Sequence, residues 1–260
     1  MIEAFLSAAA PLSDVLWTFG VVFLRVGAMM ALLPAFGEMV VPARVRIALA
    51  MAFALIVWPA VDHSRLPEAA NLMSYVTLLG AESVTGLFFG ILLRLFVIAL
   101  QIAGTIAAQS TSLSQIFGGT AGADPLPAMG HVLLIGGLAL AVILCLHVRI
   151  VEYILQSYVL VPAGQIPSPP AVAEAGLVEV SRAFSFAFSL AAPFLVASLL
   201  YNVTLGAINR AMPQLMVAFV GAPAITAGGL LILFLTAPVA LSIWSDNLFT
   251  FLGNPFGGPR

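Results

Sequence analysis

The side chains that could do covalent or metal chemistry are few, and their spacing favours neither. His131 and His147 have no cysteine or carboxylate neighbours at the spacing of metal ligands, so we expect no metal site. Glu152 follows His147 by five residues and therefore misses the i+3 and i+4 positions that would face the histidine on a helix. The chain also contains no glycine-rich phosphate loop and no GxSxG nucleophile motif. We therefore predict a protein that is not an enzyme and needs no cofactor.

An arginine inside an apolar segment is the first residue that needs a partner or a function. Arg94 lies within the apolar run 72–110, where placing its charge in lipid would cost at least ~2.5 kcal/mol on insertion scales. Gln101 and Thr105 return to nearly the same direction on a helix of 3.6 residues per turn. These intramembrane polar residues could line a transport path. We favour snorkelling of Arg94 or hydrogen bonds to a neighbouring helix.

A polar elbow between the last two apolar runs is the second candidate site. Within Tyr201–Gly229 an apolar run, a short polar stretch and another apolar run follow one another, as in a helical hairpin in an apolar environment. Pro213 lacks an N–H group, so it discourages one straight helix through this stretch. Asn209, Arg210 and Gln214 complete the elbow. These side chains could contact partner subunits, or they could be an ordinary helix-end cation and capping groups.

The stretch 112–126 is the third candidate. It is rich in Ser, Gly and Pro, which is typical of an exposed loop. However, Ile116 and Phe117 stand beside Gly118 and Gly119, and an apolar tip on a flexible loop can close a narrow channel by excluding water. On physical grounds alone, the exposed loop is the favoured interpretation.

The composition indicates the environment that positions these residues. The chain has 260 residues, of which 62% are hydrophobic and only 8% are charged, against about 25% charged residues in soluble domains. All nine basic residues are arginine, the net charge is −2 and no basic run occurs, so a nucleic-acid surface has no electrostatic basis. The single Cys145 cannot form an intramolecular disulfide. The predicted fold class is an all-α integral membrane protein.

Six hydrophobic segments are expected within a single membrane domain, 1–260. They are 12–33, 47–61, 72–110, 129–158, 184–208 and 215–252. The first four, with the loop 111–127, occupy 12–158, and a C-terminal hairpin with the elbow 209–214 occupies 184–252. The arginines are divided between the two sides, so they do not fix the orientation in the membrane.

The third hydrophobic segment, 72–110, is too long for a simple span. At ~1.5 Å per residue it exceeds the ~30 Å hydrocarbon thickness, so it must tilt, bend or leave the membrane. Gly86 and Gly90 form a GxxxG pair within it, which would permit close helix packing.

Several stretches, taken together, carry a resemblance to a known family. They are LGAINRAMPQLMVAFVGAP at 205–223, RVGAMMALLPAF at 25–36, PARVR at 42–46, the Gly86–Gly90 pair and the long third segment with its Ser/Gly loop. In order and total length the chain resembles the FliR/SctT family, the export-gate subunits of flagellar and virulence-type type III secretion systems. The similarity of the elbow favours a flagellar over an injectisome member.

The resemblance implies a fold, partners and a location. The long, bent helices would form hairpins resembling a FliP/SctR-like protein fused to a FliQ/SctS-like protein. With FliP/SctR-like and FliQ/SctS-like membrane subunits, the chain would form a pore in the bacterial inner membrane, at the flagellar basal body. Its substrates would be unfolded proteins, and the elbow would meet neighbouring subunits or FlhA/SctV-like and FlhB/SctU-like components.

The resemblance also implies that the loop after the third long helix is a pore plug. On this sequence the plug residues would be Ser112, Ser114, Ile116, Phe117, Gly118, Gly119 and Gly122. Two alternatives remain at this point: a stand-alone membrane transporter or channel, and a purely structural membrane scaffold. A transporter would predict polar residues at discontinuous helices and an inverted repeat, and no convincing repeat is present.

Overall fold

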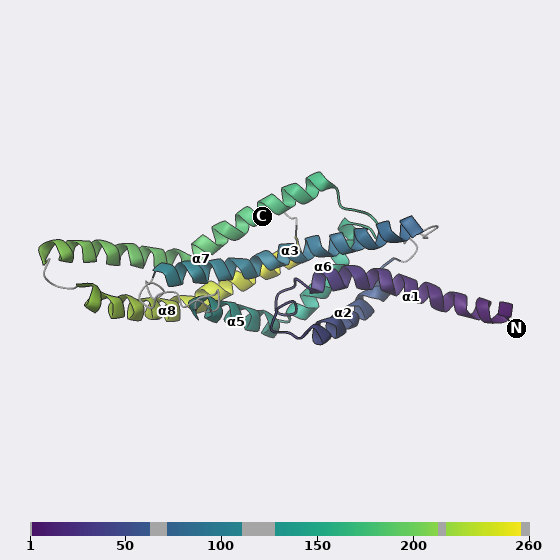
Figure 1. Ribbon diagram of the computed structural model, residues 1–260, viewed down its shortest axis with the longest axis horizontal. Coiled ribbons are helices and arrows are strands. Elements are labelled where there is room, and N and C mark those ends of the chain that lie inside the picture. Colours follow the sequence, from purple (N-terminus) through teal and green to yellow (C-terminus); the bar gives the residue numbers. More distant parts are fainter. Residues whose placement is uncertain (1, 63–71, 111–127, 213–216, 256–260) are drawn as a thin grey trace. The chain divides into compact units, whose positions relative to one another are not determined.

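The computed structural model describes residues 2–62, 72–110, 128–212 and 217–255, and all regular structure in these ranges is helical (Figure 1). The prediction of an all-α protein is confirmed. The elements are α1 (Ile2–Met30), α2 (Ala43–Val57), the short 3-10 helix η1 (Trp58–Ala60), α3 (Leu72–Ser110), α5 (Ala128–Ile143), α6 (Leu146–Leu160), α7 (Pro169–Ala211) and α8 (Val217–Gly253).

The helices have the length and composition of membrane helices. Among the described residues, four are long and apolar enough to cross a membrane: Ala43–Ala60, Met73–Ser110, Pro169–Ala211 and Ala224–Gly253. The pair α5 and α6 would make a fifth if it is one broken span, and Val15–Met30 is a shorter apolar helix. These lengths and compositions confirm the membrane class, with six as an approximate count of the hydrophobic segments.

The described residues fall into two compact units. Unit 1 lies within 1–94, 144–178 and 249–260, and unit 2 lies within 95–143 and 179–248.

In unit 1, α1 packs beside α2, as Figure 1 shows, and α1 also contacts the first half of α3. The ring of Tyr153 on α6 meets Phe89 of α3 edge to face at 5.7 Å, and its hydroxyl donates to the Phe89 carbonyl at 3.1 Å. Tyr153 and Phe89 are almost fully buried. This aromatic contact fixes α6 against α3.

In unit 2, small residues allow the end of α3 to approach α5 and α8. A Cβ atom added to Gly104 of α3 would collide with the backbone of Gly130 on α5. The indole of Trp244 on α8 is fully buried and donates from Nε1 to the carbonyl of Phe96 at 2.9 Å. The absence of side chains at the glycine contact lets the two backbones touch.

Two of the predicted hydrophobic segments do not coincide with single helices of the structure. The segment 129–158 is not one helix, because α5 ends at Ile143 and α6 begins at Leu146. Between them Cys145 has φ 62° and ψ 41°, in the left-handed region, and a right-handed helix cannot continue through such a residue.

In contrast, the predicted segment 184–208 is only part of a longer helix, α7, which begins at Pro169 and has 43 residues. Pro169 and Pro170 stand in its first turn, where proline is tolerated because the N–H group has no helical partner there. Pro193 lies inside the helix, and Figure 1 shows α7 bending along its length, as proline in a helix interior causes.

Candidate functional site

A buried ion pair joins the first and third helices of unit 1. Arg25 of α1 donates from Nε to Oε2 of Glu82 at 2.7 Å and from Nη2 to Oε1 at 3.0 Å. Both side chains are fully buried. This two-pronged geometry matches the planar guanidinium to the carboxylate and fixes both side chains in orientation as well as in distance.

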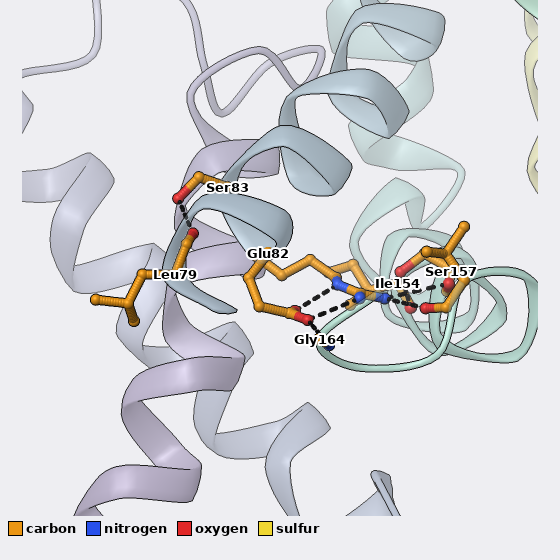
Figure 2. A network of polar contacts seen from close by, with 8 residues as sticks. Leu79, Glu82, Ser83, Ile154, Ser157 and Gly164 are labelled. Carbon is orange, nitrogen blue, oxygen red and sulfur yellow. Dashed lines mark hydrogen bonds and ion pairs between the residues drawn. The ribbon is translucent and has the colours of Figure 1, made fainter. Parts of the chain in front are cut away.

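The same two side chains bind the end of α6 and the segment that follows it. Arg25 Nη1 donates to the carbonyl oxygens of Ser157 at 3.2 Å and Val161 at 2.8 Å, while Oε1 of Glu82 accepts from the backbone N–H of Gly164 at 2.6 Å. Figure 2 shows Glu82 facing the turn that carries Gly164. The Ser157 carbonyl also accepts from the Val161 N–H at 2.9 Å, and the carbonyl end of a helix favours a cation. We call these five residues the buried ion-pair cluster.

The cluster is a structural element without reactive groups of its own. The ring of Tyr158 lies over the guanidinium of Arg25, with 3.9 Å from Cζ to the ring centroid. The charge of Arg25 is therefore held by a carboxylate, by backbone carbonyls and by an aromatic face. The charge of Glu82 is held by Arg25 and by the Gly164 N–H group. Glu82 was not among the site residues predicted from the sequence. The signal available was a carboxylate inside a long apolar run, which requires a buried cation elsewhere in the chain.

Two glycines make the close approach of α1 and α3 possible. A Cβ atom added to Gly86 would collide with the carbonyl oxygen of Arg25, and one added to Gly90 would come within 3.0 Å of the Met29 carbonyl oxygen. Gly86 is one helical turn from Glu82, so the helices touch where the ion pair forms. These are the two residues of the predicted GxxxG pair, and both lie against α1.

Arg94 has a carboxylate partner. Its Nη1 atom donates to Oε1 of Glu38 at 2.6 Å, with 25% of the Arg94 side chain and 16% of the Glu38 side chain exposed. Glu38 belongs to the connection between α1 and α2, so the ion pair joins this connection to α3. Further along α3, the hydroxyl of Thr105 donates to the carbonyl of Gln101 at 2.8 Å, within the same helix.

The structure describes only part of the predicted elbow and none of the predicted plug. Asn209 and Arg210 are exposed in the last turn of α7, which ends at Ala211. Pro213 and Gln214 lie outside the described residues. So do all the proposed plug residues: Ser112, Ser114, Ile116, Phe117, Gly118, Gly119 and Gly122. Within the described ranges, no group of three or more His, Cys, Asp or Glu side chains could hold a metal ion.

Comparison with known proteins gives the family. Residues 16–251 match the family model described as bacterial export proteins, family 1. The flagellar biosynthetic protein FliR of Caulobacter vibrioides is 32% identical over 227 residues, which cover 87% of this chain and 90% of that protein. FliR of Bacillus subtilis is 27% identical, covering 81% and 82%, and FliR of Escherichia coli is 25% identical, covering 89% and 88%. The chain therefore belongs to family 1 of the bacterial export proteins and, within it, to the flagellar FliR proteins, as the resemblance had indicated.

Proposed function

We propose that this chain is a subunit of the inner-membrane export gate of a flagellar type III secretion system. With FliP-like and FliQ-like membrane subunits it forms the pore for unfolded flagellar proteins, next to FlhA-like and FlhB-like components of the basal body. We assign it no enzymatic step. The observation that carries the proposal is the amount of apolar helix that the chain leaves uncovered.

The long helices exceed the thickness of a membrane. At ~1.5 Å per residue, the 43 residues of α7 span roughly 65 Å and the 39 residues of α3 roughly 58 Å, against ~30 Å of hydrocarbon. An ordinary tilt of about 20° shortens the projection of a helix by only a few per cent. Lipid alone therefore cannot cover these helices, and the remaining apolar length needs protein.

The chain itself does not supply that cover. Only 22% of the residues in the apolar window of α7 and 17% in that of α8 are buried within the chain, against 50% for α3. Large side chains stay exposed on both helices, such as Leu199 at 65% and Phe234 at 77%. Apolar helices from other membrane subunits would match the polarity of this surface. The relatives matched over almost the whole chain are flagellar biosynthetic proteins, which supports flagellar subunits as those partners.

We assign the plug of the pore to Ser112–Gly122. Ile116 and Phe117 would exclude water in the closed pore, while Gly118, Gly119 and Gly122 would let the segment swing aside. Displacing a few apolar side chains costs only about 1.5–3 kcal/mol for each fully buried residue. Such a plug seals the pore without metal ligands or covalent bonds and still opens when a substrate enters.

A stand-alone transporter is the weaker alternative. Such a protein needs charged or polar groups that are available to couple an ion or bind a substrate within the membrane. Here the two arginines inside α1 and α3 are paired, Arg25 with Glu82 and Arg94 with Glu38. These ion pairs join distant segments of the chain, so neither charge is available to couple an ion or bind a substrate.

Photo-crosslinking in living cells tests the proposed partner surface. A photo-reactive amino acid at Phe234 of α8 should crosslink to a FliP-like or FliQ-like subunit, because this position is 77% exposed. The matched control is Leu248 on the same helix, which is fully buried and should give only intramolecular products. Absence of any crosslink between Phe234 and another protein would contradict the proposal.

A further inference from the structure

Unit 1 contains a cavity that the proposed export function does not use. It has a volume of about 380 Å³ and opens between α1 and α2, with Ser83 of α3 also in its wall. Phe23 and Gly27 of α1 and Arg46 and Ile47 of α2 are among its lining residues. The volume lies within the ~300–1,000 Å³ range of small-molecule sites. The lining is apolar, apart from Arg46 and Ser83.

Arg46 of α2 has one guanidinium N–H group without an acceptor in the part of the chain that the structure describes. Its Nε atom is buried and has no hydrogen-bond partner within the described residues, and a buried N–H group left unpaired is costly. Four other arginines of the described chain pair with a carboxylate: Arg25, Arg94, Arg149 and Arg182. The cavity therefore places an apolar space next to a guanidinium whose Nε–H group has no acceptor among the described residues.

The neighbourhood of Arg46 adds to its positive potential. Arg46 stands in the first turn of α2, and this turn contains no acidic residue. The exposed Arg44 lies two positions earlier, and the free N–H groups of a helix N-terminus favour an anion. Ala43–Ala60 has the length and composition of a membrane span, and in a bilayer its first turn would lie at the level of the lipid headgroups. Basic side chains at this level attract anionic lipids.

We propose that this cavity binds one anionic phospholipid, with part of an acyl chain between α1 and α2 and the phosphate on Arg46. The ligand must be an amphiphile, because the site joins an apolar space to a cation. A free phosphate would leave the apolar space unfilled, and a partner's carboxylate would occupy only the polar end. A phospholipid meets both requirements and is present at the end of every membrane helix. This inference requires a membrane protein but neither a pore nor a partner subunit.

The test is native mass spectrometry of the purified full chain after equilibration with mixed vesicles. The vesicles contain equal amounts of phosphatidylglycerol and phosphatidylcholine, and the retained lipids are counted. The wild-type chain should retain one phosphatidylglycerol in preference to phosphatidylcholine. Arg46→Gln should lower this preference about fivefold, the effect of one basic residue on an anionic lipid. Arg149→Gln removes the same charge at an exposed site on α6 and should change nothing.

A second variant tests the apolar part of the site. A Cβ atom at Gly27 would have only the Phe23 ring at 3.9 Å as a near neighbour, so Gly27→Leu can place an apolar side chain in the space for the acyl chain. This variant keeps Arg46 but should lose the retained phosphatidylglycerol. If Arg46→Gln does not fold, the proposal is tested by the change in Tm on adding lipid. Phosphatidylglycerol should raise the Tm of the wild type and not that of Gly27→Leu.

Three results would overturn the proposal. The first is equal retention of phosphatidylglycerol by the wild type and both variants. The second is retention of the two lipids without preference in the wild type. The third is complete displacement of the lipid by glycerol phosphate, which would show a simple anion site.

Discussion

Arg25 and Glu82 lie 57 residues apart in the chain and are joined by two hydrogen bonds, in a place where neither side chain is exposed. Removing two charges from water costs about as much as their attraction returns, so such a pair adds little net stability compared with an apolar pair. Removing only one partner is different, because it leaves a buried charge alone. The pair therefore positions α1, α3 and the end of α6.

Glu82→Gln tests this pair. The amide has nearly the same size and its oxygen can still accept from Gly164, but it leaves the charge of Arg25 without a counter-charge. We expect the free energy of unfolding in detergent to fall by about 3–5 kcal/mol. The double variant Arg25→Met, Glu82→Leu should be less destabilised than the sum of its single variants, as measured by a double-mutant cycle. Simple additivity of the two changes would mean that the pair does not act as a unit.

Gly86→Ala tests the contact of α3 with α1. The added methyl group would collide with the carbonyl oxygen of Arg25, and overpacking of this kind costs about 1–3 kcal/mol. Gly80→Ala on the same helix has nothing within 4 Å of the added atom, so it should be neutral or stabilising. Thermal unfolding of the two variants side by side gives the answer. Equal Tm values for the two variants would mean that α1 and α3 do not touch at Gly86.

Arg210→Glu tests the proposed elbow. Arg210 is exposed in the last turn of α7, where reversing the charge disturbs the helix itself by only about 1 kcal/mol. We therefore expect normal membrane insertion but reduced export, measured as flagellar protein secreted by a complemented deletion strain. Arg149→Glu, which reverses an exposed arginine of α6, serves as the control. Normal secretion by the Arg210 variant would remove the elbow from the functional sites.

Deleting Ser114–Gly119 tests the proposed plug. The assembled complex should then leak ions in planar bilayers, because Ile116 and Phe117 no longer exclude water from the pore. Phe117→Ala should leak less than the deletion, since one apolar side chain remains. A correctly assembled deletion complex with unchanged conductance would mean that this segment is not a plug.

The sequence predicts a helix well where a long apolar run is enough to identify it. The third segment, 72–110, matches α3 as far as the structure describes it, because a long, mostly apolar run gives a clear signal for a helix. The break at Cys145 was missed, since neither glycine nor proline marks it. Its left-handed φ of 62° is a conformation that residues other than glycine seldom adopt, so the sequence gives no clue to it.

The partners of the buried charges could not be predicted in the same way. Glu82 and Arg94 each stand in the apolar run of α3, so a need for protein contacts was visible. Their partners, Arg25 and Glu38, come from distant parts of the sequence. Only the fold brings them together, because helical periodicity describes one helix at a time.

The central claim is that this chain functions as one subunit of a membrane hetero-oligomer. Native mass spectrometry of the complex extracted from its own cells in mild detergent tests it most directly. The account predicts this chain in one assembly with several copies of two smaller membrane proteins, because α3, α7 and α8 carry more apolar surface than lipid can cover. A species containing only this chain, alone or self-associated, under conditions that preserve other membrane complexes of the same cells, would contradict it.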